Sequence, residues 1–139
     1  MARDVLHRLS DQDWTVPVHA HVAAAAAVLL ERGQPVDPVT VLGQLRRQGV
    51  EDARTASRDT GVLLVELCQG APCVSSAQHY LRIVLEHSYR RRVQQAAVRL
   101  QQSAEAGSLT DLAAVVAREH AALSSCQSRL HATGALRPA

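Results

Sequence analysis

The chain has 139 residues, of which 47% are hydrophobic, 20% are charged and 2% are aromatic, and its formal net charge at pH 7 is +2. These values indicate a domain with an apolar core, exclude a disordered charged tail, and disfavour a strand-rich fold, which uses more aromatic residues. All fifteen basic residues are arginine, and the absence of lysine excludes both a conventional P-loop ATPase and an enzyme that forms a Schiff base through lysine.

The first part of the chain predicts short helices. One is expected over residues 4–9. The next begins at Pro17, buries one face at spacings of three and four residues, and stops at Gly33; the buried positions are Val18, Val22, Ala25 and Leu29.

A third helix is predicted from local capping chemistry. Asp37 can accept hydrogen bonds from free amides of the first turn, and Pro38 suits the first helical position. This helix should end at Gly49 and bury Val39, Leu42 and Leu45. Residues 51–60 are polar and are expected to form a loop. A short helix over 61–69 should follow, with Leu64, Leu67 and Cys68 turned inward.

The second part of the chain predicts a long helical hairpin. Residues 75–105 contain no proline or glycine, and such a helix would be about 45 Å long at 1.5 Å per residue, longer than a small head can cover. A last helix, capped by Thr110 and running to Gln127, should carry one stripe at helical spacing: Leu112, Val115, Val116, Glu119 and Leu123. The predicted fold class is therefore all-α, with a small helical head over 1–74, a long antiparallel two-helix hairpin over 75–127, and a flexible tail over 128–139.

Candidate chemical sites are weak. His19 and His21 point in different directions on a helix, and Cys68, Cys73 and His79 lack a recognised zinc spacing. We expect no catalytic residue, no metal and no cofactor. The cysteines are expected to be reduced core thiols, and the apolar run 22–30 is too short to span a membrane, so a cytoplasmic protein is expected.

Several motifs occur together in one order and spacing. The segment 33–41 reads Gly-Gln-Pro-Val-Asp-Pro-Val-Thr-Val and is followed by Leu45 and Gly49, and an upstream histidine, His19, precedes it. Pro72 then comes eight residues before Tyr80. Four further motif residues follow Tyr80 without a gap in the pattern: Ile83, Val84, Glu86 and Arg91. Together these residues resemble the N-terminal domain of DnaB-type replicative DNA helicases, over roughly residues 4–123. The residues that carry the resemblance as structural motifs are His19, Gly33, Pro35, Asp37, Gly49 and Pro72.

The resemblance implies a helical head and a hairpin that pairs domains into dimers, in a domain that modulates the binding of primase or a helicase loader. Three features depart from the family pattern: the family's first helix has no counterpart before Met1, a family aromatic residue is replaced by Ala23, and a family asparagine is replaced by Ser76. The linker and RecA-like motor of the family are not in this sequence, so ATP hydrolysis and unwinding are not implied.

We therefore predict a non-catalytic interaction domain of DNA replication that forms a homo-oligomer, as a dimer through its hairpin, and docks to primase, helicase loader or replicative helicase. The candidate interface residues are Tyr80, Ile83, Val84, Val93, Ala97, Val115 and Val116. An alternative is a nucleic-acid-binding or regulatory protein that uses arginines of the long helix: Arg82, Arg90, Arg91, Arg92 and Arg99. A third reading, a chain that folds without a selected partner, also stays open.

Overall fold

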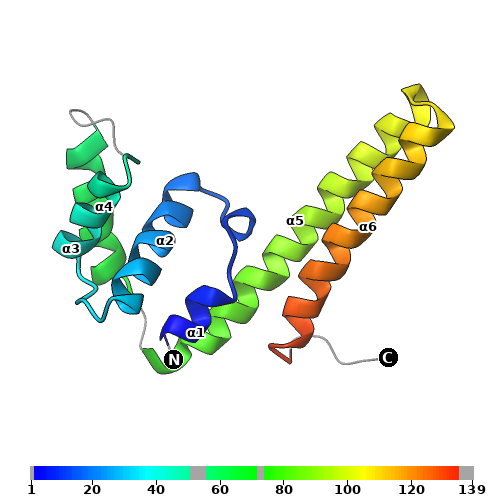
Figure 1. Ribbon diagram of the computed structural model, residues 1–139. Coiled ribbons are helices and arrows are strands. Elements are labelled where there is room, and N and C mark those ends of the chain that lie inside the picture. Colours follow the sequence, from blue (N-terminus) through cyan, green and yellow to red (C-terminus); the bar gives the residue numbers. More distant parts are fainter. Residues whose placement is uncertain (1, 51–55, 72–73, 135–139) are drawn as a thin grey trace. The chain divides into compact units, whose positions relative to one another are not determined.

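The computed structural model describes residues 2–50, 56–71 and 74–134, which fall into two compact units, 1–77 and 78–139 (Figure 1). Each unit is described by itself. Within these described residues the chain is helical, without strands, and the predicted all-α class is confirmed. None of the described helices is both long and apolar enough to cross a membrane.

The first unit, the head, consists of four α-helices and two 3-10 turns in its described residues. Helix α2 lies at its centre, with α1, the 3-10 turn η1 and α3 against it, and α4 packs on α3. In chain order the elements are α1 (Ala2–His7), η1 (Asp11–Asp13), α2 (Pro17–Glu31), α3 (Pro38–Arg47), α4 (Ala56–Gln69) and η2 (Val74–Ser76).

The starts of α2 and α3 follow from proline and capping chemistry. Pro17 and Pro38 open the two helices as predicted. At α3 the Asp37 carboxylate accepts from the amides of Val39 and Thr40, each at 2.9 Å, and the Thr40 hydroxyl oxygen accepts from the Asp37 amide at 3.0 Å. These hydrogen bonds hold the pKa of Asp37 below its usual value, the bond from the Thr40 amide contributing most, against a smaller opposing effect of burial.

The other residues of the sequence motif also have local structural roles. Gly33 and Gly49 follow α2 and α3 with φ angles of +65° and +67°, a left-handed conformation that suits glycine. The carbonyl of Pro35 accepts from the Thr40 hydroxyl at 2.9 Å. The ring of His19 meets that of Trp14 edge to face, with centroids 6.4 Å apart. Pro72 lies outside the described residues.

The head has a small aliphatic core between α2, α3 and α4. Its buried members come from the three helices, with Val22 and Leu42 packed against them: Ala25, Leu29, Val41, Leu45 and Leu64. Of the predicted face of α3, Leu45 is buried and Leu42 packs against the core, but Val39 is wrong, because it is 80% exposed and Val41 is buried instead. Val41 and Leu45 lie one turn apart, and this pair, rather than a series at every third residue, faces α2.

Helix α4 differs from its prediction in length and in the face that it buries. It begins at Ala56, so residues 56–60, which were expected to form a loop, are helical. Thr60 and Leu64 are buried one turn apart, whereas Leu67 is 40% exposed and Cys68 is exposed. Leu67 and Cys68 are therefore not core residues, because α4 turns only the narrow strip through Thr60 and Leu64 toward α3.

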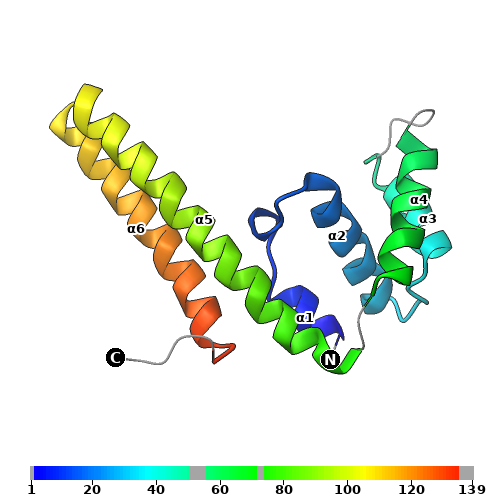
Figure 2. The ribbon, with the colours of Figure 1, turned by 180° about the vertical axis from the view of Figure 1, so that it is seen from behind.

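The second unit is the hairpin of α5 (Ala77–Ala106) and α6 (Leu109–His131), which run antiparallel side by side in both views (Figures 1 and 2). We call the contact between α5 and α6 the seam of the hairpin. Among the described residues, few side chains are buried there: Leu81, Leu85, Ser88, Ala96, Glu119 and Leu130. The turn passes through Gly107, where an added Cβ would stand 2.6 Å from the Ser103 carbonyl oxygen.

Both ends of α6 differ from the prediction. Ser108, not Thr110, caps the helix, since its hydroxyl oxygen accepts from the Asp111 amide at 3.2 Å and its proton is donated to the Asp111 carboxylate at 2.7 Å. The helix continues to His131, so residues 128–131 are helical and do not belong to a loose tail. Residues 135–139 lie outside the described part of the chain.

Two valines of α3 provide a matched test of the head core. Val41→Ala removes buried methyl groups and should lower the free energy of unfolding by about 2 kcal/mol. Val39→Ala removes the same groups from an exposed position and should change it by less than about 0.5 kcal/mol. Urea unfolding followed by circular dichroism measures both. Equal losses for the two variants would show that α3 faces the core differently.

Candidate protein-interaction surface

One carboxylate lies buried in the seam of the hairpin. The Glu119 side chain on α6 is 2% exposed, and Arg99 of α5 donates to both of its oxygens, from Nε to Oε1 at 2.9 Å and from Nη2 to Oε2 at 3.1 Å. This two-point contact fits the planar guanidinium to the planar carboxylate and so fixes both side chains. It joins residues that are twenty positions apart in the sequence.

Two further arginines lie near the same carboxylate. Arg92 Nη2 is 3.7 Å from Oε2, and Arg118 Nε is 3.6 Å from Oε1. The hydrogen bonds from Arg99 lower the pKa of Glu119 below its usual value; burial opposes this, and the charges of the three arginines reinforce it. We call Glu119, Arg92, Arg99 and Arg118 the Glu119 cluster.

The predicted interface residues all lie on the hairpin, and none of them is buried in it. Tyr80, Val93 and Val116 are 45%, 40% and 48% exposed, and Ala97 is exposed as well. Ile83, Val84 and Val115 are half-buried. Two further apolar side chains of the hairpin, which were not among the predicted residues, are also exposed: Val98 at 54% and Leu109 at 86%.

These apolar side chains form two groups along α5. Tyr80 and Val84 lie near its start and are one turn apart, as are Val93 and Ala97 near its middle. Tyr80 and Val93 are thirteen positions apart, which separates the groups by about 20 Å along the axis and by about 140° around it. The hairpin thus offers two separate apolar groups rather than one compact patch.

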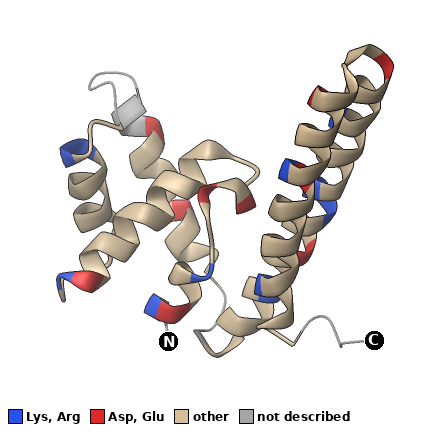
Figure 3. Cartoon of the chain, turned by 45° about the vertical axis from the view of Figure 1, so that its right-hand side comes forward, with Lys and Arg blue, Asp and Glu red and all other residues tan. Residues whose placement is uncertain are grey.

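The arginines proposed for nucleic-acid contact do not share one face. Arg82 pairs with Glu86 one turn on, at 3.5 Å. Arg92 and Arg99 point to Glu119, while Arg90 is exposed and Arg91 half-buried. Figure 3 shows these charges distributed along the hairpin. The five arginines therefore point in different directions around the hairpin.

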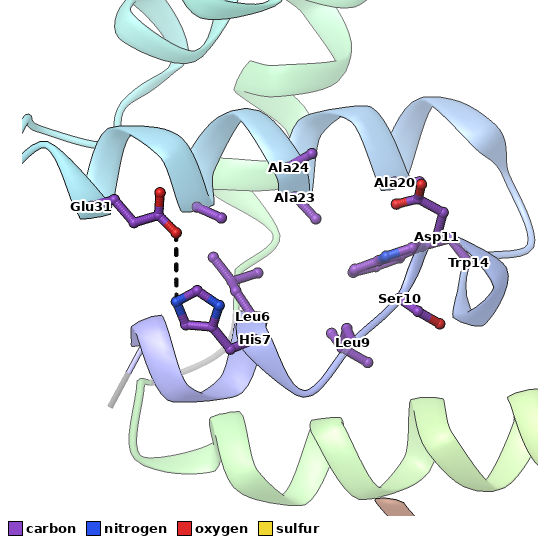
Figure 4. Close-up of a pocket in the computed structure, with 11 residues that line it drawn as sticks. Leu6, His7, Leu9, Ser10, Asp11, Trp14, Ala20, Ala23, Ala24 and Glu31 are labelled. Carbon is purple, nitrogen blue, oxygen red and sulfur yellow. Dashed lines mark ion pairs between the residues drawn. The ribbon is translucent and has the colours of Figure 1, made fainter. Parts of the chain in front are cut away.

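The head contains a cavity of about 290 Å³ between α1 and α2 (Figure 4). One wall consists of small side chains of α2, including Ala20, Ala23 and Ala24, and Trp14 lies beside them. At the other end His7 Nε2 is 3.8 Å from Glu31 Oε1. This cavity was not predicted from the sequence, because its walls come from α1, α2 and the segment between them.

The cysteines do not behave as a buried set. Cys68 is exposed and Cys126 half-buried, so the expectation of core thiols is wrong for Cys68, while Cys73 lies outside the described residues. Over residues 2–50, 56–71 and 74–134, no three His, Cys, Asp or Glu side chains come close enough together to hold a metal ion.

Comparisons with known proteins relate the chain to replicative helicases. Residues 1–86 match the model of the family described as DnaB-like helicase N terminal domain. The replicative DNA helicase DnaB of Mycobacterium leprae is 37% identical over 120 residues, which make up 85% of this chain and 19% of that relative. The chain thus spans about a fifth of the length of that curated relative.

A solved structure resembles the whole chain. The crystal structure of the N-terminal domain of DnaB helicase from Mycobacterium tuberculosis superposes with a TM-score of 0.68 and 32% sequence identity. The similarity covers 94% of this chain and 83% of that one. The family resemblance expected from the motifs is confirmed.

The lowered pKa of Glu119 predicts a specific dependence of stability on pH. Its carboxylate stabilises the folded chain at neutral pH, and this stabilisation is lost as the pH falls from the usual value of 4.5 through the lower folded pKa. Glu119→Gln should therefore unfold more easily than the wild type at pH 7, and the difference should shrink on acidification. Urea unfolding between pH 7 and pH 2 measures it. Glu105→Gln, at an exposed site on the same hairpin, should keep the pH profile of the wild type; an unchanged profile in Glu119→Gln would contradict the assignment.

Proposed function

The chain belongs to the family of DnaB-like helicase N-terminal domains, and from this premise we propose that it acts in DNA replication as a non-catalytic docking domain. It associates with a second copy through its hairpin and binds another protein of the replication machinery. The partner classes that fit this role are primase, a helicase loader and a replicative helicase. A role in replication also predicts a cytoplasmic protein.

Self-association is supported by the side chains that the hairpin leaves uncovered. Within the described residues, α5 and α6 bury few large apolar side chains between them, while Tyr80, Val93 and Val116 each expose 40% or more of their surface. Apolar side chains that lie along two paired helices contribute free energy when another protein removes them from water. The exposure of these hairpin side chains is the single observation that carries the proposal.

The length of the hairpin sets the scale of such a contact. Helix α5 has 30 residues and is about 45 Å long. Stable interfaces bury roughly 800 Å² on each partner, a requirement that contacts spread along such a helix can meet. A second hairpin is a partner of matching length and chemistry, because it presents the same valines and alanines.

No catalytic step belongs to this role. The family is defined on the N-terminal domain of these helicases, and the chain corresponds to 19% of the relative that bears the name replicative DNA helicase. A domain of this kind contributes by holding proteins together.

Charge placed at the exposed valines of the hairpin should dissociate the dimer. Val116→Glu introduces a carboxylate that loses its hydration when two hairpins pack, so the dimer should weaken by on the order of tenfold or more. Val93→Glu should act in the same way. Sedimentation equilibrium over a range of concentrations measures the dissociation constant.

Val39→Glu provides the matched control, because Val39 is 80% exposed but lies on the head. This variant should sediment as the wild type does. A wild-type chain that stays monomeric at high micromolar concentration would remove the basis for self-association.

A further inference from the structure

The two units of the chain carry opposite charge. Residues 78–139 contain eight arginines and four acidic residues, whereas residues 1–77 contain seven arginines and nine acidic residues. The hairpin therefore has a formal net charge of +4 and the head one of −2. Such an asymmetry indicates a partner that complements the basic unit.

The positive charge is concentrated at the Glu119 cluster. Three guanidinium groups provide about fifteen N–H donors, while a carboxylate accepts roughly four hydrogen bonds. The shortage of acceptors is visible at Arg92, whose buried Nε has no hydrogen-bond partner in the part of the chain that the structure describes. Glu119 thus neutralises one of three positive charges and leaves donors unused.

Two of the three guanidinium groups belong to side chains that are partly open to solvent. The side chains of Arg99 and Arg118 are 37% and 66% exposed, and both Nε atoms lie near the same oxygen of Glu119, at 2.9 and 3.6 Å. Arg99 also lines a shallow depression of about 290 Å³, together with Gln94, Gln95 and Val98. The depression is therefore next to Arg99, the arginine that holds Glu119 most closely.

We propose that this depression and the adjoining arginines bind an acidic segment of a partner protein. This inference rests on the proposed docking function and states the chemistry of the partner. A carboxylate of the partner takes up the free donors of Arg99 and Arg118. The amides of Gln94 and Gln95 can hydrogen-bond to a peptide, and the exposed Val98 contacts an apolar side chain beside its carboxylate.

The lining favours a protein over a nucleic acid. Proteins that bind single strands stack bases on aromatic rings next to a basic groove. None of the four residues that line the depression is aromatic, and two of them are amides. Val98 is not among the residues proposed for self-association, so the acidic segment and a second hairpin use different side chains.

Fluorescence anisotropy with defined probes tests this site on the full chain. The first probe is a labelled helical peptide of glutamate, leucine and alanine with its glutamates one turn apart; the second has glutamine in place of every glutamate; the third is a single-stranded oligothymidine. The acidic peptide should bind at low salt and dissociate as salt is added, and the glutamine peptide should not bind. Arg118→Gln should weaken binding of the acidic peptide by on the order of tenfold.

The matched control is Arg32→Gln, which removes an exposed arginine from the head and should leave binding unchanged. No binding of the acidic peptide, equal binding of the two peptides, or preference for oligothymidine would each overturn the proposal. Sedimentation of the wild type and of Arg118→Gln measures dimer formation, and so separates failure of this site from failure of the docking role. A chain that dimerises but ignores the acidic peptide retains the proposed self-association and lacks this site.

Discussion

The paired contact between Glu119 and Arg99 is the constraint on which the hairpin depends. A buried carboxylate is unfavourable unless charged donors satisfy it, so α5 and α6 must align in the one register that brings these residues together. The apolar residues of the seam, such as Leu81, Leu85 and Ala96, are too few and too alike to select that register alone. The ion pair thus supplies specificity, and the leucines and alanine supply most of the apolar burial.

The same constraint determines what the hairpin presents to other molecules. Because Arg92 and Arg99 turn toward Glu119, they are removed from a general basic surface and become ordered donors beside a depression. The valines that are not packed between α5 and α6 lie on the outer surface of the hairpin. The head differs, since its aliphatic side chains converge from three helices into one core. This contrast explains why docking is assigned to the hairpin.

Sequence signals predicted the starts of helices well, because a helix start depends on residues that are neighbours in the sequence. Pro17 and Pro38 open α2 and α3 as expected, and Asp37 caps α3 with its own neighbours. One position of the buried face of α3 was missed, because contacts with α2 and α4 select Val41 over Val39, and spacing alone allows either. The choice between Ser108 and Thr110 as a cap likewise depends on where the turn at Gly107 ends.

The candidate site was predictable only in part. The valines of the hairpin could be identified from the sequence, but the partners of Glu119 could not, because Arg99 is twenty residues away. One signal was present: Glu119 occupies a position on the apolar stripe of α6, where a charged side chain needs a partner across the seam. A charged residue on such a stripe indicates an ion pair.

A double-mutant cycle on Arg99 and Glu119 tests most directly whether this pair holds the hairpin in register. Equilibrium unfolding of Arg99→Gln, Glu119→Gln and the double variant gives the coupling free energy. The reference is the same cycle on Arg82 and Glu86, an exposed pair one turn apart on α5. A favourable coupling clearly larger than that of the reference pair is expected, and a coupling equal to or smaller than the reference would contradict the role given to Glu119.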